Sequence, residues 1–185
     1  EKPVSKELIK EILDVAKQAP SGGNLQPWHI HVISGKKLDQ IVSDIELKIT
    51  DMPMGEKTEY DVYPPNLWEP YRSRRFKCGE DLYKSINIPR EDKSARLSQL
   101  AKNLRFFDAP VGLFVYIDRK MGPPQWSDVG MFLQTVMLIA REKGLHSCAQ
   151  EAWAMWHSTV NKHLVVDDKF MLFCGMGIGL SLIHI

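Results

Sequence analysis

The chain has 185 residues, of which 44% are hydrophobic and 25% are charged, a composition typical of one compact globular domain. Its 24 Lys and Arg residues nearly balance 23 Asp and Glu residues, so the charge does not favour a nucleic acid as partner. The three cysteines are widely spaced, which indicates reduced thiols and a cytoplasmic protein rather than a disulfide framework. No apolar run reaches the roughly 18 residues of a membrane span, so no membrane association is expected.

The first half of the chain alternates helix and strand signals without a regular repeat. Ser5 is a predicted helix N-cap, because apolar residues recur at helical spacing directly after it. Four prolines between 51 and 70 predict an irregular segment. In chain order we predict a helix from Ser5 to Ala19, a loop over 21–24, a strand over 29–34, a helix with its apolar face at 38–45, the irregular segment, and helices over 71–86 and 90–106. The last of these should turn four apolar residues inward: Leu97, Leu100, Ala101 and Leu104.

The second half contains the most apolar stretches. Residues 111–117 form a nearly continuous apolar run, which predicts a central strand covered on both faces. The helix predicted over 125–143 is apolar on most faces, so it should be central to the fold or buried in a subunit interface. A helix over 151–164 and a strand over 169–176 complete an α+β domain.

Several chemical motifs can be set aside on their context. Gly175, Gly177 and Gly179 imitate a dinucleotide-binding loop, but the chain ends too soon afterwards for the helix that such a loop needs. His29 and His31 share one face of a strand, but no third ligand accompanies them, so no metal site is predicted. The basic cluster 72–77 is expected to be a solvated helix face paired with acidic neighbours, or else an anion-steering rim.

A polar loop between the first helix and the first strand is more specific. Residues 19–28 (APSGGNLQPW) combine a glycine pair, a hydroxyl and two amides. Glycines let a ligand approach the backbone, and neutral donors and acceptors suit a flat polar ring better than a metal. Taken alone, the same residues could form an ordinary glycine-rich turn.

This decapeptide resembles the A-P-S-x-x-N-x-Q-P-W signature of the FMN-dependent nitroreductase family. Residues 144–153 (GLHSCAQEAW) are similar to the flavin segment of that family, and residues 103–111 resemble a third motif. The resemblance runs from residue 2 to residue 179. It implies an α+β fold with a mixed, mostly antiparallel central sheet flanked by helices, formed by one FMN-binding domain (1–179) with an inserted segment at about 51–90.

The resemblance also implies a flavin site at the interface of a homodimer, with the long helix in that interface. The loop would contact the flavin from the neighbouring subunit, the backbone of 150–152 would bond N5 and O4, and two further side chains would lie near the pyrimidine edge. The implied cofactor-binding residues are Pro20, Ser21, Gly22, Gly23, Asn24, Gln26, Asn103, Arg105, Ala149, Gln150, Glu151 and Ala152. In one chain alone, the loop and the Glu151 segment should face open space.

The activity implied is reduction of a nitroaromatic or quinone-like acceptor by NADPH or NADH through flavin N5, in a ping-pong cycle without a catalytic side chain or a metal. Aromatic residues that could line the pocket or fill the core are Phe106, Phe107, Trp68 and Tyr71. Alternatives are dehalogenation or ene reduction within the family, or a homologue that lacks turnover, with or without flavin.

The phosphate-binding residues of the family would lie just before residues 2–4 and after residues 170–176. We therefore expect truncation at both ends and weak FMN binding. The last six residues, 180–185 (LSLIHI), are encoded by a transposon-end adapter and are expected to be a non-native tail.

Overall fold

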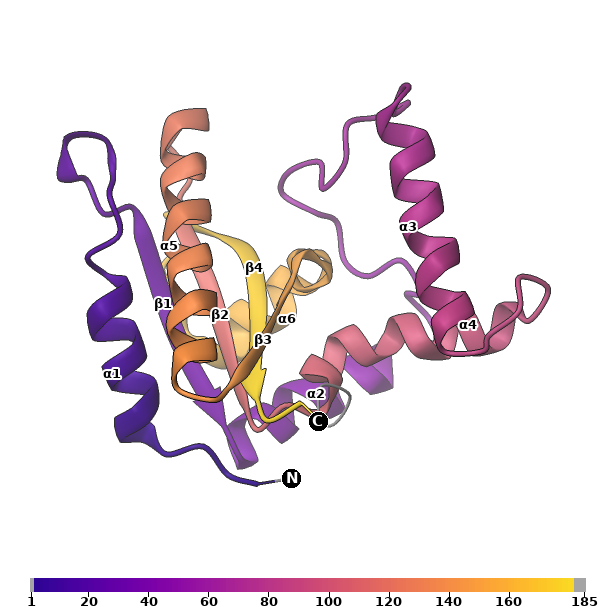
Figure 1. Cartoon of the computed structure of the whole chain (residues 1–185), viewed down its shortest axis with the longest axis horizontal. Coiled ribbons are helices and arrows are strands. Elements are labelled where there is room, and N and C mark those ends of the chain that lie inside the picture. The colour runs from indigo at the N-terminus through magenta and orange to yellow at the C-terminus, as the bar shows by residue number, and fades with distance from the viewer. Residues whose placement is uncertain (1, 182–185) are drawn as a thin grey trace.

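The computed structural model describes residues 2–181, so most of the predicted tail lies outside the described residues. Its centre is a sheet in the order β1-β2-β4-β3 (Figure 1). The strands are β1 (Trp28–Ser34), β2 (Val111–Asp118), β3 (His146–Gln150) and β4 (Phe170–Gly179). The predicted α+β fold is confirmed, and within the described part all three strand pairings are antiparallel, without the parallel pairing that a mixed sheet would add.

Helices cover both faces of this sheet. α1 (Lys6–Ala16) and α5 (Pro123–Glu142) pack on one face, and α2 (Lys36–Lys48) and α6 (His157–Leu164) pack on the other. Alternate residues of β2 enter the two cores, with Val115 on the α1 and α5 side and Phe114 on the α2 and α6 side. The prediction of a doubly covered central strand is therefore confirmed. None of the helices within residues 2–181 is long and apolar enough to cross a membrane.

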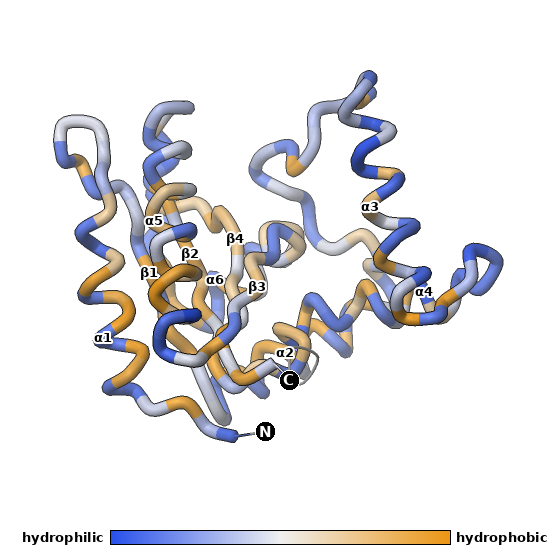
Figure 2. The backbone as a smooth tube through the Cα atoms, in the orientation of Figure 1, coloured by the Kyte–Doolittle hydropathy of each residue, from blue (hydrophilic) through white to orange (hydrophobic). Residues whose placement is uncertain are grey.

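Two helices stand apart from this body. α3 (Tyr71–Ser85) and α4 (Lys93–Ala101) form a projecting arm (Figure 1), and neither contains a buried residue. Figure 2 shows hydrophobic stretches concentrated in the sheet and its covering helices, whereas the arm is largely hydrophilic with scattered hydrophobic positions. Leu97, predicted to face inward, is 66% exposed, and Leu100 is also exposed. The prediction is wrong for these two leucines because the arm has no core of its own to bury them, but it is confirmed for Leu104, which is buried, and Ala101 is half-buried.

Two of the predicted helices, those over 90–106 and 151–164, are interrupted. The helix predicted over 90–106 ends at Ala101 and continues as the 3₁₀ helix η2 (Lys102–Asp108). Phe106 and Phe107 there have φ of 51°, a left-handed conformation that no helical periodicity can predict. The helix predicted over 151–164 is likewise a 3₁₀ helix, η3 (Glu151–Trp156), followed by α6. β3 was not predicted, because its five residues carry no period-two apolar pattern.

Gly175, Gly177 and Gly179 are part of β4, which ends at Gly179, and they form no loop. A Cβ atom on Gly175 would lie 2.3 Å from Trp153 Cδ1, and one on Gly112 of the neighbouring strand would lie 2.5 Å from Phe106 Cε2. The two aromatic rings stack at 4.4 Å over this glycine surface. Phe106 is therefore a core residue and does not line a pocket, whereas Phe107 is exposed, as are Trp68 and Tyr71 near or in the arm.

Candidate functional site

The first expected flavin segment lies between α1 and β1 and includes the 3₁₀ helix η1 (Gly22–Asn24). Its polar side chains bond one another: Ser21 Oγ accepts from the Gln26 N–H at 3.0 Å, and Gln26 Nε2 donates to Asn24 Oδ1 at 2.9 Å. Gly23, Asn24 and Gln26 have positive φ, so the loop is tightly folded. Pro20 and residues 22–26 are exposed, which leaves this face of the loop open to a ligand.

One residue that sequence reasoning missed fixes this loop. Asp128, on the buried face of α5, accepts a hydrogen bond from the Gly22 N–H at 3.2 Å through Oδ2. A buried carboxylate needs such a partner, and the bond ties the loop to the helix. The signal was available in the sequence, because a charged residue stands at the start of an otherwise apolar helix face.

The second expected segment, residues 149–152, lies where β3 meets η3. Gln150 is only 3% exposed, and its Nε2 donates to the Asn103 backbone oxygen at 3.0 Å. The structure thus brings Asn103 and Gln150 together. Ala149 and Glu151 are exposed and Ala152 is half-buried. Partial desolvation of the Glu151 carboxyl raises its pKa.

Arg105 is oriented differently from Asn103. Its guanidinium forms ion pairs with Asp108 at 2.8 Å and with Glu46 of α2 at 3.8 Å. No hydrogen bond or ion pair within residues 2–181 joins it to Gln150 or Glu151. The structure therefore places Arg105 in a surface ion-pair cluster of its own chain.

The two segments expected to contact a flavin do not meet within one chain. The loop leads into β1 and Gln150 ends β3, and these strands are the opposite edges of the sheet. Three strand spacings separate them, about 14 Å. Two surface hollows, of about 530 and 550 Å³, lie along α2, and neither is lined by residues 20–26 or 149–152.

These residues fit a flavin better than a metal. β3 is an edge strand in the described part of the chain, so alternate residues direct backbone N–H and C=O groups away from β4. Gln150 Oε1 is buried without a hydrogen-bond partner among residues 2–181, so a polar acceptor remains beside that edge. The loop adds neutral donors and acceptors. Within the same residues, no cluster of three His, Cys, Asp or Glu side chains could hold a metal ion.

An aromatic cluster that was not predicted borders the second segment. Tyr60, Trp126 and Phe173 contact one another with ring centroids 5.2 to 6.0 Å apart. The Tyr60 hydroxyl donates to the Phe173 backbone oxygen, and burial together with the nearby charge of Glu151 raises the pKa of that hydroxyl. Sequence reasoning missed Tyr60 because it lies in the irregular segment, where no periodicity indicates burial.

Comparison with known proteins gives a consistent result. The nitroreductase family model matches residues 1–180. The chain is 37% identical to a nitrobenzene nitroreductase of Ectopseudomonas oleovorans over 97% of this chain and 79% of that protein. It is 38% identical to a 4-nitrobenzoate reductase of Pseudomonas putida over 96% and 77%.

Two solved structures share the fold closely. The FMN and NADPH-dependent nitroreductase NfnB from sphigopyxis sp. strain HMH superposes with a TM-score of 0.96 and 45% identity, covering 100% of this chain and 82% of that one. The FMN-dependent nitroreductase NfnB from Mycobacterium smegmatis, in complex with NADPH, has a TM-score of 0.91 and 25% identity, covering 99% and 81%.

Proposed function

Because the chain belongs to the nitroreductase family, we propose that it is an FMN-dependent oxidoreductase that reduces nitroaromatic compounds with NADPH. The observation that carries this proposal is the match along almost the whole chain, in both sequence and fold, to proteins named for that activity. When bound, FMN would supply the redox chemistry, namely acceptance of hydride from NAD(P)H at N5 and transfer of two electrons to the acceptor in a ping-pong cycle.

The residues of the chain bind and orient the ring. The open backbone edge at residues 149–152 offers N–H donors, which stabilise negative charge where it develops. The hydrogen bond between Gln150 and Asn103 holds the end of β3 against η2. Ser21, Asn24 and Gln26 supply neutral polar groups from the loop that Asp128 anchors.

We further propose that a homodimer completes the site. The loop and the Glu151 segment lie at opposite edges of one sheet, so one flavin would contact both only if a second copy supplied one of them. Met131 and Leu138 of α5 are exposed on the side that does not face the sheet, which favours this helix as part of the interface.

The test is anaerobic and spectroscopic. The protein is incubated with FMN and freed of unbound cofactor, and the flavin absorbance is followed. We expect NADPH to bleach the bound flavin and 4-nitrobenzoate to restore it, with parallel lines in double-reciprocal plots. Bound flavin that NADPH does not bleach would contradict the enzyme assignment and leave a flavin-binding homologue. If only a haloaromatic compound or an activated alkene restores the absorbance of the bleached flavin, that compound class replaces nitroaromatic compounds as the proposed acceptor.

The same preparation tests how the cofactor phosphate is held. Arg105, the one cation among the proposed site residues, is already paired with Asp108 and Glu46. We therefore expect riboflavin and FMN to bind the protein with similar dissociation constants, measured from the quenching of flavin fluorescence. A preference of about a hundredfold for FMN, the effect of roughly two charge-assisted hydrogen bonds, would reveal a phosphate partner outside these residues.

A further inference from the structure

Residues 52–60, which we term the strap, belong to the segment between α2 and the arm and lie against the body. The strap forms contacts with η3 and α6 at three successive places. Gly55, with φ of +76°, approaches so closely that a Cβ atom there would lie 2.7 Å from the Met155 backbone oxygen. Glu59 pairs with Arg119 and lies 3.6 Å from His157 Nδ1. The third contact, through Glu56, is the most specific.

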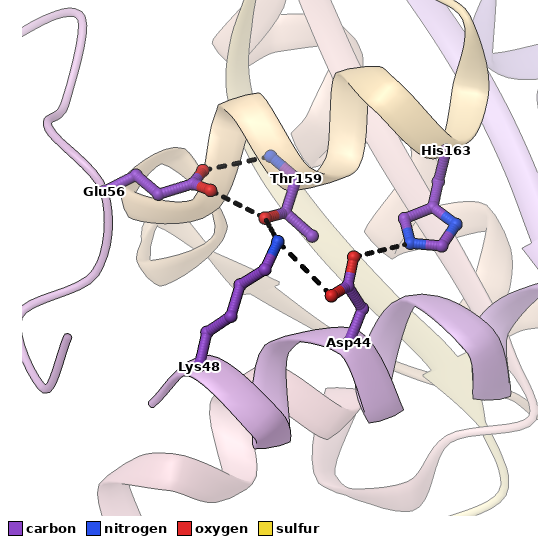
Figure 3. Close-up of polar contacts among 5 residues, drawn as sticks. All are labelled: Asp44, Lys48, Glu56, Thr159 and His163. Atoms are coloured by element: carbon purple, nitrogen blue, oxygen red, sulfur yellow. Dashed lines mark hydrogen bonds and ion pairs between the residues drawn. The ribbon is translucent and has the colours of Figure 1, made fainter. Parts of the chain in front are cut away.

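Glu56 caps the N-terminus of α6 from outside the helix. Trp156 occupies the N-cap position, and its side chain forms no capping hydrogen bond. Glu56 Oε2 instead accepts from the Thr159 N–H at 3.0 Å, and Oε1 accepts from Thr159 Oγ1 at 2.6 Å (Figure 3). A carboxylate at this position both satisfies a free backbone donor and opposes the positive end of the helix dipole.

The same threonine joins the strap to α2. Thr159 is 1% exposed, and its hydroxyl, which donates to Glu56, also accepts from Lys48 Nζ at 2.8 Å. Lys48 pairs with Asp44 at 3.3 Å, and His163 Nε2 lies 3.0 Å from Asp44 Oδ2 (Figure 3). Partial burial acts to raise the pKa of Asp44, but hydrogen bonds and nearby charge from His163 and Lys48 together outweigh it and lower that pKa. The network therefore holds the strap, α2 and α6 in one arrangement.

We propose that the strap is a positioning element for the segment 150–156, with Glu56 as the positioning residue. This inference rests on the proposed function, in which that segment borders the flavin. The three-residue turns of η3 leave its backbone weakly held by its own hydrogen bonds, so its position depends on what fixes its ends. Gln150 fixes one end through Asn103, and the strap fixes the other through Met155 and the start of α6.

The test compares Glu56→Ala and Glu56→Gln with Glu11→Ala in the full chain. Glu11 is a matched control, since it pairs with Lys143 at 2.6 Å on the opposite side of the sheet. Hydrogen exchange of residues 151–160 is measured without cofactor, and FMN affinity and the midpoint potential of bound FMN are measured separately. We expect Glu56→Ala to raise the hydrogen-exchange rate of residues 151–160 and the FMN dissociation constant about five- to tenfold each. This is the change expected when the stabilisation from one helix cap is lost.

Glu56→Gln should give an intermediate effect, because its amide oxygen can still accept from the Thr159 N–H but the hydroxyl loses its acceptor. Glu11→Ala should change neither quantity. An unchanged exchange rate at residues 151–160 in Glu56→Ala would overturn the claim that the strap holds this segment in place. Raised exchange with unchanged affinity and potential would overturn its positioning role. Failure of the unmodified chain to bind FMN would refute the proposed function, which is a separate outcome read before any variant.

Discussion

The body, which is the sheet with its covering helices α1, α2, α5 and α6, and the arm, which is α3 and α4, differ in how much of each is buried. In the body, residues of α1, α2, α5 and α6 pack from both sides onto a sheet whose central strand β2 is buried from Val111 to Ile117. In the arm, α3 and α4 contain no buried residue and are joined by surface contacts, such as the ion pair between Arg96 and Glu80 at 2.7 Å. The body therefore accounts for its own stability, whereas the arm keeps large apolar side chains such as Phe76 and Leu97 exposed, as expected of a part that is completed by a contact outside the single chain.

Removal of an aromatic ring should separate the two regions most strongly. Trp153 is fully buried between Phe106 and Phe114, so Trp153→Ala should lower the free energy of unfolding by about 3–5 kcal/mol. Phe76 of the arm is exposed, and Phe76→Ala should stay within about 0.5 kcal/mol of the unmodified chain at low protein concentration. Urea denaturation measures both, and equal losses would mean that the arm has a core after all.

Two glycines provide the next contrast. Gly175→Ala places a methyl group against the Trp153 ring and should cost about 1–3 kcal/mol. Gly79 lies within α3 with open space around it, so Gly79→Ala should favour the helix by about 0.5–1 kcal/mol. Thermal unfolding followed by circular dichroism distinguishes them. A stabilising Gly175→Ala would show that the glycine surface under the rings is not required.

These contrasts also explain what could be predicted from the sequence. The N-cap at Ser5, the buried strand β2 and the long helix α5 are set by local periodicity and are found where they were predicted. β3, the left-handed turn at Phe106 and the burial of Gln150 depend on tertiary partners, so no local pattern indicates them. The polar loop was identified by its residue types, but its anchor Asp128 and the strap contact of Glu56 lie over 100 residues from their partners.

Helix caps give a third, smaller test. Ser5 Oγ accepts from the Leu8 N–H at 3.1 Å in α1, and Asp92 Oδ1 accepts from the Ala95 N–H at 2.9 Å in α4. Ser5→Ala should reduce global stability by about 1 kcal/mol, because α1 unfolds with the core. Asp92→Ala should instead increase hydrogen exchange within α4 without moving the global transition, because the arm opens locally. A shift of the global transition by Asp92→Ala would mean that arm and body unfold as one unit.

The smallest expected effect is a difference in pH dependence between Glu151 in the body and Glu69 beside the arm. Partial desolvation raises the pKa of Glu151, whereas hydrogen bonds from Ser73 and Arg72 lower the pKa of Glu69. In the unfolded chain both carboxyls are protonated below the ordinary glutamate range, whereas the folded Glu69 stays ionised until the pH falls through its lowered pKa. As pH rises through that range, Glu151 ionises in the unfolded chain before it ionises in the folded chain, so Glu151 lowers the free energy of unfolding. The ionised Glu69 instead raises the free energy of unfolding, and this contribution is lost as pH falls through its lowered pKa. Glu151→Gln should therefore stabilise the chain and Glu69→Gln should destabilise it near neutral pH, and both differences should vanish in acid. Urea titrations at several pH values measure the signs, and two variants that shift stability in the same direction would contradict the opposite environments of these carboxyls.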